Sequence, residues 1–369
     1  MAAKAYIPKF IFTGEQWLHE HAAIVFDGIV TDVLPVTALD PQIEAVNFTD
    51  HILAPAFIDL QIYGAYEKLF SVYHDTDSLQ LLNKYSSSGG AAFCMPTVAT
   101  NRPEVFFKCI DAIRLYWQQG GEGILGLHAE GPWINKLKRG AHIESLIHSP
   151  SLQEVKALLD YGKDVLKIIT VAPEVCSKEV TDLIHSAGIK IFAGHSNATY
   201  EEAMHSFDNG ITAVTHLYNA MSPLLHRSPG MVGAAFDHQH IMASIIADGY
   251  HVDYAAISIA KKIMQQRLFA ITDAVTTTTE GYYKHQPDGD KYTAGNILSG
   301  SALTMYKALQ NLVKHVGIET GEAIRMCSLY PAQIMGMEDR LGRIAPGYKA
   351  NMVLLPELLD NTDELGMIS

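Results

Sequence analysis

The sequence predicts a (β/α)₈ barrel, because short apolar runs alternate with helix-like stretches through most of its 369 residues. The runs are rich in Val, Ile and Ala, which is typical of parallel strands buried on both faces. Eight such runs are present, at residues 56–62, 91–96, 124–128, 165–171, 189–193, 213–216, 242–246 and 268–272.

Both ends of the chain differ from this middle region and predict a small sheet domain. Residues 7–12 and 22–25 are β-like, and Asp27-Gly28 marks a turn. A turn at Pro346-Gly347 is followed by a short apolar strand at residues 351–355. We therefore expect the small domain to comprise residues 1–53 plus 336–369, and the barrel residues 54–335.

The composition excludes several classes of protein. Hydrophobic residues make up 48% of the chain and charged residues 18%, which allows a large core and argues against disorder. The net charge of −13 argues against a nucleic-acid partner, because DNA binding needs a cationic surface. An acidic protein can still bind one phosphate through a local Arg and His pocket.

The cysteines and the apolar runs indicate where the protein works. The four cysteines, Cys94, Cys109, Cys176 and Cys327, are widely spaced, so we expect free thiols in a reducing cytosol. No run approaches the roughly 18 apolar residues of a membrane span. The first twelve residues lack the features of a secretion signal. We expect a cytoplasmic protein with no membrane partner.

Polar residues stand at or just beyond the ends of several apolar runs. Four of them combine metal-ligand and acid–base chemistry, and these are Glu130, His195, His216 and Asp273. In a (β/α)₈ barrel the carboxyl ends of all strands meet on one face, where the active site lies. The sequence therefore predicts that the four side chains share one site.

Glu130, His195 and His216 are the candidate metal ligands. Two imidazoles and one carboxylate leave a position open for water, as in catalytic zinc sites. Bound zinc lowers the pKa of its water toward neutrality. Asp273 is then the candidate general base and acid, which takes a proton from water and delivers it to a leaving amine.

Each of these residues also has an ordinary explanation when taken alone. The chain has 17 His, and most strand-end histidines lie in a core or on a surface. Asp273 could cap a helix, and Glu130 before Gly131-Pro132 could belong to a turn. The combination of four such residues at predicted strand ends favours a site.

The chain resembles the N-acetylglucosamine-6-phosphate deacetylases of the amidohydrolase superfamily. The resemblance runs from the N-terminal strands to about Leu355 and rests on eight ordered motifs: PAFID (55–59), HAEGPW (128–133), APE (172–174), GHSNAT (194–199), THLYNAM (215–221), IADGYHVD (246–253), LSGSALTM (298–305) and YPA (330–332). It implies a TIM-like barrel with a small β-sandwich built from both termini.

The resemblance also implies roles for individual residues. Glu130, His195 and His216 match the metal ligands, and Asp273 matches the catalytic aspartate. His142 matches a histidine that approaches the acetyl carbonyl oxygen, where a hydrogen bond stabilises developing negative charge. The residues that match substrate-binding positions are His142, Asn219, Ala220, Arg227 and His251.

Arg227 matches an arginine that binds the substrate phosphate and can come from the partner subunit, which implies a homodimer. A guanidinium suits this task because it binds two phosphate oxygens at once. Without the resemblance, Arg227 would be one solvated charge among many, and His142 a loop histidine on a basic surface.

One departure from the superfamily concerns the first strand. Many amidohydrolases carry His-x-His there, whereas this chain has Asp59-Leu60-Gln61 in its place. Glutamine is a poor zinc ligand, so we expect one divalent metal ion, zinc in the first instance, with Fe, Co or Mn as alternatives.

The sequence thus predicts metal-dependent deacetylation of N-acetyl-D-glucosamine 6-phosphate in amino-sugar catabolism or recycling. Two alternatives stay open at this point. The substrate could be another amide, such as an N-acyl amino acid or a cyclic amide, which the candidate phosphate cluster argues against. The barrel could also have lost catalysis and serve as a binding protein, which the four retained site residues argue against.

Overall fold

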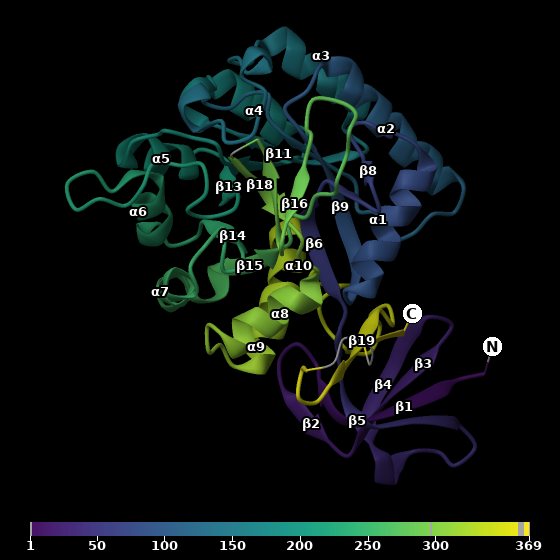
Figure 1. Ribbon diagram of the computed structural model, residues 1–369. Coiled ribbons are helices and arrows are strands. Elements are labelled where there is room, and N and C mark those ends of the chain that lie inside the picture. Colours follow the sequence, from purple (N-terminus) through teal and green to yellow (C-terminus); the bar gives the residue numbers. More distant parts are fainter. Residues whose placement is uncertain (1, 296, 361–364, 369) are drawn as a thin grey trace. The chain divides into compact units, whose positions relative to one another are not determined.

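The structure is a computed structural model that describes residues 2–295, 297–360 and 365–368. Its chain divides into two compact units (Figure 1). The first comprises Met1–Asp59, Ser86–Phe93 and Thr304–Ser369, and the second comprises Leu60–Tyr85 and Cys94–Leu303. The domain boundaries expected at residues 53/54 and 335/336 stay a prediction.

An eight-stranded sheet forms the barrel, which confirms the predicted fold class. Its strands follow one another in chain order, and each pair from β9 to β15 is parallel. Its members are β6 (Phe57–Ile62), β9 (Ala91–Ala99), β10 (Leu127–Glu130), β11 (Leu166–Val171), β12 (Lys190–Ala193), β13 (Ile211–Val214), β14 (Met242–Ile246) and β15 (Leu268–Ile271). Every one of the eight apolar runs recognised in the sequence overlaps one of these strands.

The first and last barrel strands approach each other where they end. Ile62 forms an isolated parallel bridge with Ala274. The backbone N–H of Asp273 donates to the carbonyl of Gln61 at 3.0 Å, and the N–H of Tyr63 donates to the carbonyl of Ala274 at 2.8 Å. These bonds bring the end of β6 beside the residues that follow β15, so side chains from both ends of the barrel sequence can meet.

Helices connect the strands and lie outside them (Figure 1). They begin at clear signals, such as the reciprocal capping box of Thr199 and Glu202 and the cap that Ser151 gives to the N–H of Glu154. The helices are α1 (Thr76–Ser88), α2 (Pro103–Gln118), α3 (Leu152–Gly162), α4 (Lys178–Ser186), α5 (Tyr200–Phe207), α6 (Gly230–Asp237) and α7 (Tyr254–Met264). Each helix returns the chain to the end of the barrel at which the strands begin. The carboxyl ends of the strands, which are followed by polar residues, therefore all lie on one face.

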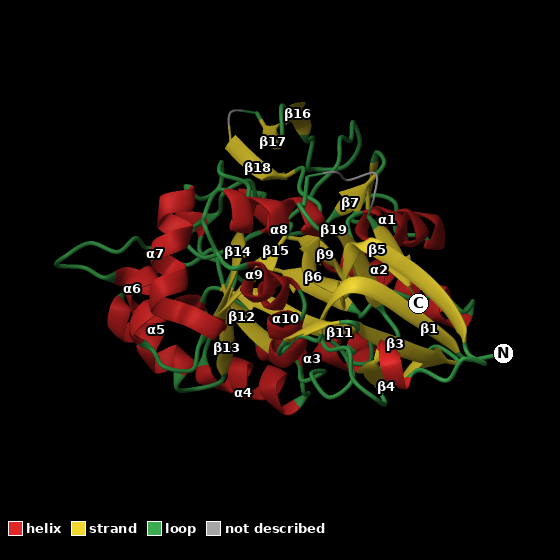
Figure 2. Cartoon of the chain, turned by 90° about the horizontal axis from the view of Figure 1, so that it is seen from below, coloured by secondary structure: helices red, strands yellow, loops and turns green. Residues whose placement is uncertain are grey.

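Two small sheets accompany the barrel strands. Figure 2 shows the three-stranded sheet apart from the barrel strands. Its strands are β16 (Gln286–Asp288), β17 (Lys291–Ala294) and β18 (Ile297–Ser301), and the other sheet pairs β7 (Gly64–Ala65) with β8 (Lys68–Leu69). Ser301 N–H donates to the carbonyl of Asp273 at 3.0 Å, so the end of β18 joins the loop after β15.

The termini form one sheet, as the sequence predicted. The sheet joins β1 (Lys4–Phe12), β2 (Trp17–His19), β3 (His21–Phe26), β4 (Ile29–Pro35), β5 (Glu44–Pro55), β19 (Met352–Pro356) and β20 (Gly366–Ile368). The C-terminal β19 pairs antiparallel with β5, and both contribute to an apolar cluster that includes Ile11, Leu53 and Met352. The same unit contains α8 (Met305–Lys314), α9 (Thr320–Cys327) and α10 (Leu329–Met335).

The chain after Leu355 is acidic, with Asp360, Asp363 and Glu364 close together. Of the acidic C-terminal stretch, Asp363 and Glu364 lie outside the described residues. Within the described part of the chain, the helices are too short or too polar for any of them to cross a membrane.

Candidate active site

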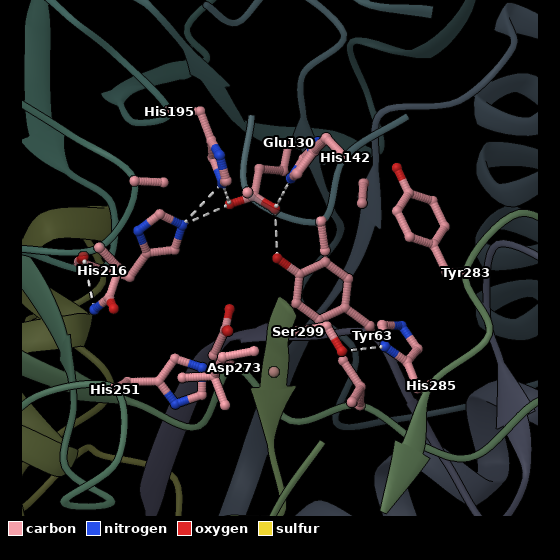
Figure 3. Close-up of a pocket in the computed structure, with 18 of the residues that line it drawn as sticks. Tyr63, Glu130, His142, His195, His216, His251, Asp273, Tyr283, His285 and Ser299 are labelled. Atoms are coloured by element: carbon pink, nitrogen blue, oxygen red, sulfur yellow. Dashed lines mark hydrogen bonds and ion pairs between the residues drawn. The ribbon is translucent and has the colours of Figure 1, made fainter. Parts of the chain in front are cut away.

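The four strand-end residues predicted from the sequence lie around one cavity. Glu130 is the last residue of β10, and His195, His216 and Asp273 follow β12, β13 and β15 by two residues each. All four line a cavity of about 330 Å³ (Figure 3). They are almost fully buried, with exposed fractions between 1% and 8%. The parallel strand order therefore assembles the site from residues that are far apart in the sequence.

The backbone turns sharply at three of these residues. His195, His216 and Asp273 have φ angles of 48°, 34° and 55°, in the left-handed region that residues other than glycine seldom adopt. Such strain persists where the surrounding structure enforces it, and it concentrates at functional sites. Here the turn directs each side chain from its strand end into the cavity.

The ligand atoms of Glu130, His195 and His216 lie close together. Nε2 of His216 is 3.1 Å from Oε1 of Glu130 and 3.1 Å from Nε2 of His195, and the third side of the triangle is 3.4 Å. A tetrahedral zinc site with bonds of about 2.0–2.2 Å separates its ligand atoms by about 3.3–3.5 Å. The spacing and the donor types therefore fit a divalent ion.

The hydrogen bond of His195 supports this assignment. Nδ1 of His195 lies 2.9 Å from the carbonyl oxygen of Lys138, which can only accept, so Nδ1 carries the ring hydrogen. In the neutral ring this leaves the Nε2 lone pair facing Oε1 of Glu130, and two acceptors 3.4 Å apart repel each other. A cation between them removes the repulsion, and a ring fixed through its other nitrogen is typical of metal-binding histidines.

The second oxygen of Glu130 is held by donors. The Tyr63 hydroxyl donates to Oε2 at 2.5 Å, and Nε2 of His142 lies 3.2 Å away (Figure 3). Burial raises the pKa of Glu130, but the charge of His195 and hydrogen bonds from the histidines hold that pKa well below its usual range. Burial and the charges of Glu130 and Asp273 raise the pKa of Tyr63, which keeps the phenol protonated.

Gln61 connects the candidate ligand to the candidate base. Its Nε2 lies 2.8 Å from Oδ1 of Asp273 and 3.1 Å from Oε1 of Glu130. From the sequence we expect Asp59-Leu60-Gln61 to stand where other amidohydrolases carry His-x-His. In the structure Gln61 reaches Glu130, and so does Tyr63 two residues further on, because alternate residues of a strand point to the same side.

His142 presents an N–H group to the cavity. The backbone N–H of Thr100 donates to Nδ1 of His142 at 3.3 Å, and the Thr100 hydroxyl lies 2.7 Å from the same nitrogen. With Nδ1 accepting, the ring hydrogen is on Nε2, which points toward Glu130. Burial, followed by the charge of His195, lowers the pKa of His142 to about 4. The ring is therefore neutral at pH 7 and serves as a hydrogen-bond donor.

Three of the candidate substrate-binding residues line the same cavity. Asn219, Ala220 and His251 all line it. Nδ1 of His251 lies 2.6 Å from Oδ2 of Asp248, so Asp248 orients the ring. The other oxygen of Asp248 accepts the backbone N–H of His251 at 2.8 Å, which fixes the loop as well.

Arg227 is the one residue predicted for the site that does not line this cavity. It is exposed, beside His226, in the loop that precedes α6. Leu225 and Ser228 close this turn with two backbone hydrogen bonds of 3.1 Å. The loop that precedes α6 projects beyond the neighbouring helices (Figures 1 and 2).

Several cavity residues carry no clear signal in the sequence. Tyr63, Tyr283, His285 and Ser299 line the cavity, and Lys138 is the one Lys or Arg among the described lining residues. Nδ1 of His285 lies 2.9 Å from the Ser299 hydroxyl, and burial lowers the pKa of His285 to about 4. Ser299 falls in the LSGSALTM motif, which is the only signal that could have indicated one of these residues.

Two family models together match nearly the whole chain. A model of the amidohydrolase family matches residues 52–365, and a model of the NagA composite domain matches residues 8–53.

Several similar proteins align with this chain over nearly the full length of both. An N-acetylglucosamine-6-phosphate deacetylase of Haemophilus influenzae is 33% identical and aligns over 95% of this chain and 94% of its own length. An N-acetylgalactosamine-6-phosphate deacetylase of Escherichia coli is 30% identical over 94% of this chain and 93% of its own. The crystal structure of N-acetylglucosamine-6-phosphate deacetylase from Pasteurella multocida superimposes with a TM-score of 0.93 at 30% identity, covering 99% of this chain and 100% of that chain.

The metal assignment can be tested by binding alone. We expect protein stripped with a chelator to regain one zinc ion per chain, because Glu130, His195 and His216 supply three ligands at one point. His195→Ala should lower the affinity for zinc by at least about 100-fold, measured by competition with a chromophoric chelator. His251→Ala, which removes a cavity imidazole outside the cluster, is the control. Equal zinc affinity in both variants would refute the ligand set.

Proposed function

The chain belongs to the amidohydrolase family, and we propose that it hydrolyses the acetamide of N-acetyl-D-glucosamine 6-phosphate to D-glucosamine 6-phosphate and acetate. The observation that carries the proposal is the buried Glu130, His195 and His216 cluster facing Asp273 across one cavity. Full-length relatives that bear the name of this deacetylase support the substrate. A phosphorylated sugar is retained in cells by its charge, which supports the cytoplasmic location expected from the sequence.

One divalent ion, zinc in the first instance, fits the site. Bound there, it would act as a Lewis acid on the acetyl carbonyl and lower the pKa of a water molecule. Two imidazoles and one carboxylate also suit Fe, Co or Mn, so availability decides between them.

Asp273 is suited to move the proton. It stands at the strand end next to the cluster, and Gln61 holds its Oδ1 at 2.8 Å. As a general base it accepts a proton from the attacking water, and as a general acid it passes this proton to the departing nitrogen. His142 donates its Nε2–H to the carbonyl oxygen as that oxygen gains negative charge. Thr100 keeps the hydrogen on the required nitrogen.

The sugar phosphate requires more positive charge than the cavity of one chain supplies. His142 and His285 are neutral at pH 7, and Lys138 is the one Lys or Arg among the described lining residues. Asn219 and the backbone at Ala220 can donate hydrogen bonds to phosphate oxygens, and His251 can bind the sugar. The remaining cation would be Arg227 of a second copy of this chain, which implies a homodimer.

The proposal predicts a specific pattern of acetate release. Chelator-stripped protein should be inactive, and addition of zinc should restore acetate release from N-acetylglucosamine 6-phosphate. N-acetylglucosamine without phosphate should have a kcat/KM lower by at least about 100-fold, because the phosphate supplies binding energy that positions the amide. Absence of release with zinc, iron, cobalt or manganese, from folded metal-loaded protein, would refute the proposal.

A second candidate substrate is N-acetylgalactosamine 6-phosphate, which the Escherichia coli relative favours by its name. The two sugars differ only in the orientation of one hydroxyl, and a site that hydrogen-bonds a hydroxyl discriminates strongly against its absence. Assaying both substrates side by side gives the ratio of their kcat/KM values. A ratio that favours the galactosamine derivative would assign the second function.

Asp273→Asn tests the assigned base. Asparagine retains the size of the side chain but cannot accept the proton, so kcat should fall by about 10²–10⁴-fold while zinc content stays near one per chain. The control is Asp248→Asn, which lies on the other side of His251 and should act mainly on KM. Substantial acetate release by Asp273→Asn would show that another group serves as the base.

Mixed dimers test where Arg227 acts. Arg227→Ala and Asp273→Asn should each be nearly inactive, the first through a higher KM. If Arg227 serves the partner's cavity, a mixed dimer has one complete site, and random pairing restores up to about a quarter of the wild-type rate. No recovery, from subunits shown to exchange, would place Arg227 outside the partner's site.

A further inference from the structure

Tyr63 makes the shortest hydrogen bond to the candidate metal ligand Glu130. Its hydroxyl oxygen lies 2.5 Å from Oε2 of Glu130, within the bounds of a strong O–H···O⁻ bond (Figure 3). Tyr63 comes directly after β6, and Glu130 is the last residue of β10, so two strands of the barrel hold the pair together. Tyr63 is 9% exposed and Glu130 is 1% exposed, which excludes water from the bond.

The direction of this hydrogen bond follows from Gln61. Nε2 of Gln61 lies 2.7 Å from the Tyr63 oxygen and can only donate. The phenol oxygen therefore accepts from Gln61, and its own hydrogen is directed to Oε2 of Glu130. Gln61 therefore donates a hydrogen bond to Tyr63, and Tyr63 in turn donates one to Glu130.

The two oxygens of Glu130 consequently have different surroundings. Oε1 faces Nε2 of His195 and Nε2 of His216 at 3.4 Å and 3.1 Å, and the amide of Gln61 lies 3.1 Å from it on another side. Oε2 faces the hydroxyl of Tyr63 and, at 3.2 Å, Nε2 of His142. A carboxylate can bind a metal ion through one oxygen or through both. The Tyr63 hydroxyl holds Oε2 even when His142 gives its one N–H to a substrate carbonyl, and both candidate imidazole ligands face Oε1, so Oε1 is the oxygen available to an ion.

We propose that Tyr63 is a positioning residue of the metal centre, which holds Oε2 of Glu130 so that this carboxylate binds the ion through Oε1 alone. The inference rests on the proposed metal-dependent function and deepens it. A one-oxygen ligand keeps the coordination number low and leaves room for water and the substrate carbonyl. Gln61 and Tyr63 also fill the space beside Glu130 with neutral donors.

The test compares two variants, each of which removes the hydroxyl of one tyrosine that lines the cavity. Tyr63→Phe removes the hydroxyl that contacts Glu130. Tyr283→Phe removes a hydroxyl that donates to the Thr100 carbonyl at 2.6 Å and makes no contact with the cluster. Zinc affinity of chelator-stripped protein is measured by competition with a chromophoric chelator. We expect Tyr63→Phe to bind zinc about 10–100-fold more weakly than wild type, and Tyr283→Phe to match wild type.

A second measurement reports the coordination number of the bound ion. With saturating cobalt in place of zinc, visible absorption weakens as the coordination number rises. We expect weaker absorption in Tyr63→Phe, because the freed Oε2 can join the ion, and an unchanged spectrum in Tyr283→Phe. Unchanged affinity together with an unchanged spectrum in Tyr63→Phe would overturn the inference.

Thermal unfolding of the metal-free proteins separates positioning from a purely structural role. Metal-free Tyr63→Phe should unfold within a few degrees of metal-free wild type. Tyr63→Leu serves as a second variant, and if both lose their fold without metal, Tyr63 is a structural residue and the inference is wrong. None of these measurements uses substrate, so a failure to release acetate with zinc binding intact would refute only the proposed function.

Discussion

The close approach of Oε1 of Glu130 to the Nε2 atoms of His195 and His216 is the constraint on which the site depends. When both rings are neutral and turn their Nε2 lone pairs inward, these three buried groups lie within 3.1–3.4 Å of one another and suit a cation between them. The surrounding contacts serve this arrangement. The Lys138 carbonyl fixes the His195 ring, and Tyr63 fixes the far oxygen of Glu130. These outer contacts orient the ligands before any ion binds.

The barrel makes such an arrangement possible because it brings strand ends to one face without flexible parts. Left-handed backbone at His195, His216 and Asp273 turns each side chain inward directly after its strand. The backbone bonds between Gln61 and Asp273 then bring the first and last strands of the barrel together. The rigid sheet supports the backbone strain, and the side chains keep their geometry.

Charge matters in two ways in the cavity. At the cluster, burial keeps His142 neutral, so it donates a hydrogen bond without adding charge beside an ion. The phosphate of the proposed substrate needs cations, and Lys138 is the one Lys or Arg among the described lining residues. In the homodimer proposed above, the exposed Arg227 of one chain would complete the cavity of the other.

Much of this could be predicted from the sequence, because it depends on local patterns. Apolar runs gave all eight barrel strands, and polar residues at their ends gave Glu130, His195, His216 and Asp273. The contacts of Tyr63, Gln61, Thr100 and Lys138 could not be predicted, because neutral side chains and backbone carbonyls leave no local pattern. Tyr63 and Glu130 are 67 residues apart, and Gln61 and Asp273 are 212 apart. Only closure of the barrel, which pairs strands distant in the sequence, decides which of these groups meet.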